Sequence, residues 1–401
     1  MEQRGALDGI RVLDFGRYVA GPFCATLLAD FGADVIRIER PGGGEDRSIA
    51  PVTDEGDGAL FLQINRNKRS VTFDPRSDIG REVQRRLILT ADVVVVNVPE
   101  SGLQAMGLDY ETLCSIRSDI VLANLSSFGP RGPWAQRPGF DSVGQAMCGS
   151  AYLSGPGDVP YRTPIAWVDH AAALYAAFGV MVALFERART GRGQQISGSL
   201  LGSAVGFAAS YLIEQAVRGL DRVAIGNRSS LNGPTDTFQT RDGWIATQVV
   251  GSAIFRRWAA LMDEPGWTED PRFATDALRG DNGALLSQRM QAWCAERCTA
   301  EALEALAQAH IPAGPVLSLG QVLEHPQVRA MGLFAPMRVP GLEQAVPLVA
   351  PPIELSGTPA VIRRPPPRAG EHNAEILQPL GFTEAQIVAL RESAARAAKA
   401  E

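Results

Sequence analysis

The sequence contains few of the side chains on which most enzyme mechanisms rely. Among its 401 residues the only lysines are Lys68 and Lys399, and the four histidines and five cysteines are scattered. No group of histidines and cysteines stands at the spacing of a zinc site, so we predict no metal. The chain also has no P-loop and no catalytic-triad signature. Carboxylates are the main reactive groups that remain.

Long basic runs and long apolar runs are missing as well. The net charge is -6, which predicts that nucleic acid is not a partner. The apolar runs at 171–185 and 200–213 are shorter than the ~20 residues needed to span a bilayer, so we expect buried core helices and no membrane partner. The polar start has no apolar signal-peptide stretch, and the scattered cysteines fit a reducing compartment; both favour a cytoplasmic protein.

Strands and helices alternate through the first half of the chain. The pattern predicts strands at 9–15, 34–39, 69–73, 91–97 and 120–126, with helices at 23–31, 80–89 and 110–117. This alternation is typical of a doubly wound, Rossmann-like α/β domain. The turn after the first strand lacks the GxGxxG spacing of dinucleotide sites. Ligands of such folds lie at the carboxyl ends of strands, where Arg40 and Asn97 stand.

The second half of the chain divides by composition. We expect residues 1–218 to form the large α/β domain, which contains a second long helix over 200–217, and residues 219–234 to be a polar linker. Residues 235–330 have hairpin and helix signals and predict a smaller α+β domain. Residues 331–401 begin with an extended, proline-containing return. They end in helices that pack on the large domain, the last reaching about Lys399.

One carboxylate stands in a conspicuous place. Asp169 follows an uncharged lead-in and precedes the uncharged run 171–185, which ends in arginines and Gly191. This pattern predicts a helix with Asp169 at its N-cap or in its first turn. Asp169 is then either a simple cap or a reactive group. His170 follows it directly, but neighbouring helical residues point about 100° apart, which favours a packing role for His170.

A carboxylate such as Asp169 can do two kinds of chemistry. It can act as a general base beside a carbon acid. It can also act as a covalent nucleophile. The second role suits the transfer of a thiol group, because the aspartyl thioester formed is equal in type to the substrate thioester and the exchange is nearly isoenergetic.

The chain resembles the family III CoA-transferases, the group of formyl-CoA, carnitine and benzylsuccinate CoA-transferases, and the related α-methylacyl-CoA racemases. The resemblance covers nearly the whole length. It rests on the order of several segments: Leu7–Phe15, Ala20–Pro22, Gly32–Arg40, Asn67–Ser70, Arg137–Asp141, Glu186–Gly193 and Gly370–Asn373.

The resemblance implies a function and a site. Asp169 matches the family's catalytic aspartate, and the active-site loop matches Gly139, Phe140 and Asp141. Coenzyme A or its acyl thioester is the substrate, with no permanently bound cofactor. The positions that match CoA contacts are Val19, Ala20, Arg40, Phe73, Arg76, Asn97, Val98 and Arg137. The family fold further implies a ring-shaped subunit in an interlocked homodimer.

Two enzyme activities remain open within this resemblance. The first is CoA transfer from an acyl-CoA to a small carboxylic acid, through an anhydride and then an aspartyl-CoA thioester. The alternative is racemisation by proton transfer at Cα, which in the racemases uses a histidine where this chain has Phe140. The sequence also differs from the formyl-CoA transferases at two places. Ala105 stands where those enzymes have an arginine that contacts CoA, and residues 249–252 replace their longer glycine-rich loop over the active site. The shorter loop argues against oxalate as the acceptor.

Overall fold

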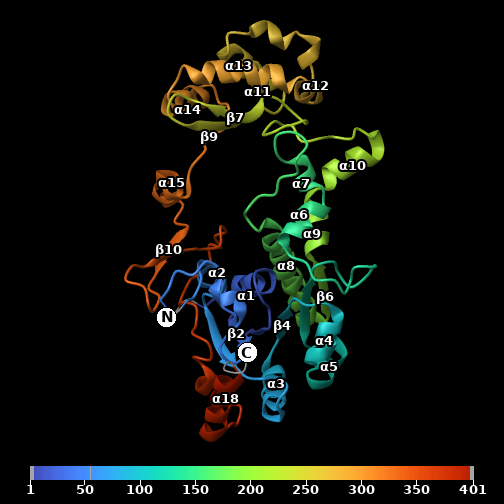
Figure 1. Cartoon of the computed structure of the whole chain (residues 1–401), viewed down its shortest axis with the longest axis vertical. Helices are drawn as coiled ribbons and strands as arrows, with labels where there is room; N and C mark the ends of the chain where they lie inside the picture. Colours follow the sequence, from blue (N-terminus) through green and yellow to red (C-terminus); the bar gives the residue numbers. More distant parts are fainter. Residues whose placement is uncertain (1–3, 55, 398–401) are drawn as a thin grey trace. The chain divides into compact units, whose positions relative to one another are not determined.

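The computed structural model describes residues 4–54 and 56–397, drawn in Figure 1. The chain forms two compact units. Unit 1 contains 1–148, 165–207 and 330–401, and unit 2 contains 149–164 and 208–329. Unit 2 therefore also takes in 149–164 and 208–234, which were expected to belong to the large domain or the linker. Residue 399, where the last helix was expected to end, lies outside the described residues.

Unit 1 is built on a six-stranded sheet in the order β3-β2-β1-β4-β5-β6. All neighbouring strands are parallel. This is the strand order of a doubly wound nucleotide-binding fold, and the predicted α/β class is confirmed. The strands are β1 (Arg11–Asp14), β2 (Asp34–Glu39), β3 (Lys68–Thr72), β4 (Val93–Val96), β5 (Val121–Ser126) and β6 (Gln195–Ser199).

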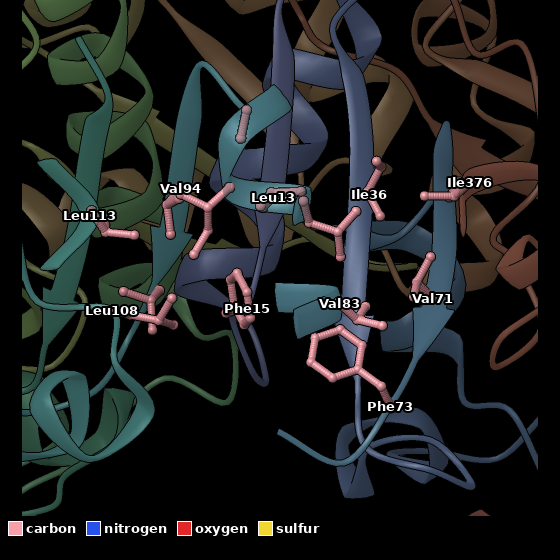
Figure 2. Close-up of a cluster of buried hydrophobic side chains, with 14 of the residues drawn as sticks. Leu13, Phe15, Ile36, Val71, Phe73, Val83, Val94, Leu108, Leu113 and Ile376 are labelled. Carbon is pink, nitrogen blue, oxygen red and sulfur yellow. The ribbon is translucent and has the colours of Figure 1, made fainter. Parts of the chain in front are cut away.

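Side chains of the strands alternate between two buried faces. Leu13, Ile36, Val71 and Val94 point to one face, where Figure 2 shows them packed with side chains of the covering helices. The helices on this face include α3 (Asp78–Thr90), α5 (Tyr110–Ile116), α17 (Asn373–Leu377) and α18 (Glu384–Ala397). The other face is covered by α1 (Ala20–Asp30) and α8 (Trp167–Thr190), which also contact each other.

The remaining elements of unit 1 are short. They are a 3-10 helix, η1 (Glu45–Ser48), then α2 (Ala59–Ile64), α4 (Glu100–Met106), α6 (Asp141–Met147), α9 (Leu200–Phe207), β10 (Phe334–Met337) and β11 (Val346–Val349). In the extended segment that was expected to begin at residue 331, β10 and β11 form an antiparallel pair, which packs on Phe61 and Leu62 of α2.

Unit 2 has its own hydrophobic core. The antiparallel sheet β7-β8-β9 packs against helices through Phe238, Ile245 and the fully buried Trp258. Its strands are β7 (Thr235–Gln239), β8 (Trp244–Gln248) and β9 (Ala313–Pro315). Its helices are α7 (Ser150–Leu153), α10 (Ala209–Arg218), α11 (Ser252–Leu261), α12 (Asp276–Asp281), α13 (Gly283–Ala295), α14 (Thr299–Gln308), α15 (Leu319–Glu324) and α16 (Pro326–Ala330), with 3-10 helices η2 (Pro265–Thr268) and η3 (Pro271–Phe273).

The expectation for the two apolar runs is partly wrong. α8 has 24 residues and by length and composition could cross a membrane, although core helices pass the same test. Only 44% of an apolar 18-residue stretch of α8 is buried, so it is not simply a core helix. The second run is not one helix, because it breaks at Ala208 into α9 and α10, and no residue of α10 is buried.

Candidate active site

The site begins at the point where the strand order of the sheet reverses, between β1 and β4. The turn after β1 runs from Gly16 to Val19, and Asn97 follows β4. The Asn97 amide accepts from the Arg17 backbone N–H and donates to the Arg17 carbonyl, both at 2.8 Å. Tyr18 has a left-handed φ of 61°, and its N–H donates to Asp46 at 3.1 Å. Side chains from other elements therefore hold this turn at the carboxyl edge, where ligands of doubly wound folds bind.

A buried ionic network lies beneath the turn. Arg37 binds both carboxylate oxygens of Asp46, at 3.0 and 2.8 Å. The Lys68 ammonium donates to Asp14 at 2.7 Å, and the other Asp14 oxygen accepts from the Gly16 N–H. Burial lowers the pKa of Lys68 to about 8, against the raising effect of Asp14. Removing one partner would leave an uncompensated buried charge, so this network fixes the turn firmly.

Two pockets open on either side of this turn. The first, of about 250 Å³, is lined by Phe15, Gly16, Arg17, Arg37, Ile38, Glu39, Arg40, Gly44, Glu45, Asp46, Phe73, Pro75, Gln84 and Met106. The second, of about 240 Å³, is lined by Arg17, Tyr18, Val19, Ala20, Asn97, Val98, Pro99, Leu125, Ser126, Ser127, Gln136, Pro138, Gly139, Phe140, Asp169 and Leu200. Arg17 lines both, so a ligand that occupies both pockets passes this side chain.

Asp169 lines the second pocket from the first turn of α8. It is the third residue of the helix, and the N-cap is Ala166. Of the two positions that the sequence allowed for Asp169, the first turn is therefore confirmed and the N-cap is wrong. The α8 terminus is capped instead by Asp141 of α6. One Asp141 oxygen accepts from the backbone N–H of Val168 at 2.7 Å and from that of Asp169 at 3.3 Å. The other accepts from the buried amide of Gln145.

The electrostatics of Asp169 differ from the expectation for a residue in the first turn of a helix. Burial, and then the charge of Asp141, raise the pKa of Asp169 to about 7. A helix N-terminus alone would stabilise the ionised form. Here the two nearest N–H groups are already bound to Asp141, so desolvation and like-charge repulsion dominate. Near neutral pH, Asp169 is therefore a basic carboxylate that can both react and exchange a proton.

His170 is held by packing and a backbone bond. Its Nδ1 lies 2.7 Å from the Ala166 carbonyl, which can only accept, so this nitrogen donates. Its ring packs edge-on against Phe23 at 4.8 Å. These contacts support the packing role that helix geometry favoured over a working Asp–His pair.

The structure brings most of the predicted site residues to the two pockets. Arg40 and Phe73 line the first. Val19, Ala20, Asn97, Val98, Gly139, Phe140 and Asp169 line the second. The Asn97 amide holds the Arg17 backbone. Asp141 is buried behind Asp169 as a helix cap and does not line either pocket.

Two predicted arginines do not line these pockets. Arg76 binds Asp74 at 3.0 Å, and Arg137 lies over the Trp134 ring at 4.3 Å. Sequence reasoning also missed Arg17, Tyr18 and Glu45. Arg17 and Tyr18 lie two and three residues after the predicted strand 9–15, so their place near the end of a strand, the signal that applied to Arg40, could have found them. Glu45 becomes part of the site only through tertiary contacts.

Comparison with known proteins identifies the family. The sequence model of CoA-transferase family III matches residues 7–373. This chain belongs to that family. The resemblance drawn from the sequence motifs is thus confirmed, and so is the prediction of an acyl-CoA:carboxylate CoA-transferase.

Several proteins similar to this chain are CoA-transferases that act on known acids. A succinyl-CoA–D-citramalate CoA-transferase from Chloroflexus aurantiacus is 34% identical over 96% of both chains. A succinate–glutarate CoA-transferase from Agrobacterium fabrum is 32% identical over 94% of this chain and 96% of its own. A formyl-CoA:oxalate CoA-transferase from Rhodopseudomonas palustris is 31% identical over 97% of both.

Solved structures agree with this family fold. A CAIB/BAIF family protein from Brucella suis has a TM-score of 0.80 and 33% identity, covering 94% of this chain and 100% of its own. Rv3272 from Mycobacterium tuberculosis has a TM-score of 0.80 and 31% identity, with the same coverage.

Proposed function

We propose that the chain transfers CoA from succinyl-CoA to a small dicarboxylic acid through covalent intermediates on Asp169. The observation that carries the proposal is a basic, partly buried carboxylate lining a pocket at the carboxyl edge of the sheet. In the first step the ionised Asp169 attacks the thioester carbonyl of the donor. The C–S bond breaks, CoA thiolate leaves, and a mixed anhydride forms on Asp169.

The thiolate then attacks the aspartyl carbonyl of the anhydride. The donor acid leaves as a carboxylate, and Asp169 carries CoA as a thioester. The acceptor carboxylate attacks the aspartyl thioester, which releases CoA thiolate and forms a second mixed anhydride. The thiolate then attacks the acceptor carbonyl of this anhydride, which gives the acceptor acyl-CoA and frees the Asp169 carboxylate. Each step exchanges a thiolate or carboxylate for another, so no proton or electron has to be supplied. Desolvation favours the attack, because Asp169 loses its unfavourable charge when the anhydride forms.

The substrate proposal rests on the relatives. Relatives at 32–34% identity are named for succinyl-CoA or succinate, with D-citramalate or glutarate. Each of these acids has two carboxylates, which is the reason for proposing a dicarboxylic acid as the acceptor.

CoA is proposed to span both pockets. The first pocket offers apolar walls, including Phe73, for the base, and arginines 17 and 40 for phosphates. The second offers the narrow path along Val19, Ala20 and Val98 to Asp169 for the pantetheine arm and thioester. Arg76 and Arg137 are proposed as CoA contacts only in a bound state with different side-chain positions.

The assembly is proposed to be a homodimer of interlocked rings in the cytoplasm. A row of large apolar side chains on α8 supports association: Leu174, Tyr175, Phe178, Val182 and Phe185 are 49–69% exposed. Such a contiguous row on one helix is typical of an interface.

Racemisation is the alternative activity. The raised pKa of Asp169 suits proton transfer at Cα, but that reaction needs a second base, and Phe140 stands at the position of the racemase histidine. Incubation with a 2-methylacyl-CoA in deuterated water should therefore give no exchange at Cα above background. Rapid exchange would favour the racemase.

The decisive experiment for transfer traps the intermediate. Purified protein is supplied with succinyl-CoA and a panel of dicarboxylic acids, then treated with hydroxylamine or borohydride, and the labelled residue is found by peptide mass spectrometry. We expect the label on Asp169 and no transfer by Asp169→Ala or Asp169→Asn, while CoA still binds. A label on Asp141, or a tenth of wild-type turnover in Asp169→Ala, would exclude the covalent role of Asp169.

A further inference from the structure

A carboxylate lies among the cations of the first pocket. Glu45, the first residue of η1, forms an ion pair with Arg17 and lies 3.8 Å from the Arg40 guanidinium. The Tyr18 hydroxyl donates to the same carboxylate at 3.2 Å. Three donors from two separate turns therefore converge on one anionic group.

The backbone of Arg17 and Tyr18 and the Arg40 side chain have anchors other than Glu45. The Arg17 backbone is held by Asn97, and the Tyr18 N–H by the buried Asp46. The Arg40 Nε donates to the Gly43 carbonyl at 3.0 Å. Two guanidinium groups and a hydroxyl on fixed backbone are the kind of donor set that binds phosphate oxygens.

The loop that carries Glu45 is anchored on its other side. Arg47, two residues later, binds both oxygens of the buried Glu39, at 2.9 and 2.8 Å. Before it, Gly42 and Gly43 have left-handed φ values of 86° and 92°. Directly before Glu45, the Gly44 N–H donates to Glu39 at 3.3 Å, so the backbone is held on both sides of Glu45 and only its side chain has to move. The Glu45 side chain is 41% exposed, which leaves it free to turn toward solvent.

We propose that Glu45 is a built-in occupant of an anion site, and that a phosphate of CoA must displace it. This inference rests on the proposed CoA-transferase function. A phosphate and the Glu45 carboxylate cannot share the donors of Arg17, Arg40 and Tyr18, because like charges repel. Glu45 therefore weakens the binding of any anion at this position by the same displacement cost, and a ligand with many further contacts, such as CoA, can overcome that cost where a small acid cannot. Since Arg17 also lines the second pocket, Glu45 keeps the small acids from occupying the phosphate position.

Binding of three ligands tests this role. Calorimetry with full-length wild type and Glu45→Gln would use CoA, dephospho-CoA, which keeps only the diphosphate, and pantetheine, which has no phosphate. We expect Glu45→Gln to bind CoA roughly three- to tenfold more tightly at low salt, with the gain shrinking as salt rises. Pantetheine should bind both proteins equally. If Glu45→Gln also binds dephospho-CoA more tightly than the wild type does, the site belongs to the diphosphate. If the two proteins bind dephospho-CoA equally, the site belongs to the 3′-phosphate.

Two further variants control the measurement. Glu324→Gln removes an equally charged, exposed carboxylate that pairs with Arg329 in unit 2, and it should leave CoA affinity unchanged. In the background of Arg17→Gln, the gain from Glu45→Gln should fall, because the two side chains interact directly. The inference about Glu45, but not the proposed function, would be overturned if Glu45→Gln bound CoA no more tightly than the wild type. It would also be overturned if Glu45→Gln improved pantetheine binding as much as CoA binding. Absence of CoA binding by wild type would instead reject the proposed function.

Discussion

At the scale of single residues, the proposed chemistry depends on the surroundings of Asp169. An isolated aspartate in the first turn of a helix would be a weak, fully ionised base. Burial and the neighbouring Asp141 raise its pKa to about 7, which makes the carboxylate basic enough to be a good nucleophile. The same shift has consequences for stability and for the pH dependence of the rate.

Stability should depend on pH through Asp169. Its pKa is about 7 in the folded chain and near 3.8 when unfolded, so the folded state binds the proton more tightly. Wild type should therefore lose stability relative to Asp169→Asn as the pH rises from 4 to 8, by roughly 1–3 kcal/mol. Urea unfolding at fixed protein concentration measures the difference. The exposed Asp158→Asn is the control, and a pH-independent difference for Asp169→Asn would contradict the shift.

The rate should carry the same signature. We expect kcat/KM of the wild type to fall below about pH 7, as Asp169 becomes protonated. Asp141→Asn removes the neighbouring charge while its amide oxygen still accepts from Val168. In Asp141→Asn the fall in kcat/KM should therefore occur at lower pH than in the wild type. It should still lie above the pKa of a free aspartate, because Asp169 remains buried. A fall at the same pH in both pH–rate profiles would show that Asp141 acts only as a helix cap.

At the scale of elements, the position of Asp169 depends on the close packing of α6 on α8. A Cβ on Gly144 would lie 2.8 Å from a methyl carbon of Val168, so only glycine allows this approach. The packing brings Asp141 onto the free N–H groups of α8, 27 and 28 residues further along the chain.

Substitution of this glycine should loosen the site. We expect Gly144→Ala to destabilise the fold by roughly 1–3 kcal/mol, because the added methyl overpacks the contact, and to lower kcat. Val168→Ala should lower the free energy of unfolding less in the Gly144→Ala variant than in the wild type, because it makes room for the added methyl. A double-mutant cycle measured by urea unfolding gives this difference. Gly206→Ala in α9, where the new Cβ meets no atom nearer than 3.7 Å, is the matched control. Equal stability of both single variants would refute the packing argument.

At the scale of the whole molecule, one face of α8 presents large apolar side chains to water. Phe178 and Phe185 are each 69% exposed, and they lie seven residues apart on the same side of the helix. Leaving such a surface in water is unfavourable, so a second copy of the chain is the proposed cover.

Association can be measured directly. Light scattering of the wild type at low micromolar concentration should give about twice the 42.9 kDa chain mass. Phe178→Glu combined with Phe185→Glu should shift the protein toward the monomer, because two charges cannot be buried in an apolar interface without partners. Leu319→Glu, which charges a side chain that is 86% exposed in unit 2, should leave the mass unchanged. A monomeric wild type would reject the dimer.

The sequence by itself determined what depends on local pattern. Alternating strand and helix signals predicted the parallel α/β fold, and β2 and β5 lie within one residue of where the pattern placed them. Asp169 was found because an uncharged lead-in, a single carboxylate and a long apolar run are neighbours in the chain. Family motifs identified the chemistry class.

Only the tertiary structure decided what depends on distant residues. The cap of α8 comes from Asp141, the support of Tyr18 from Asp46, and the occupant of the arginine site is Glu45. None of these pairs has a fixed sequence spacing, since each is formed when separate elements pack. The pKa of Asp169 has the same origin, because desolvation and the neighbouring charge of Asp141 exist only after folding. The local pattern indicated only an aspartate at the start of a helix, whereas in the folded chain its pKa is raised to about 7.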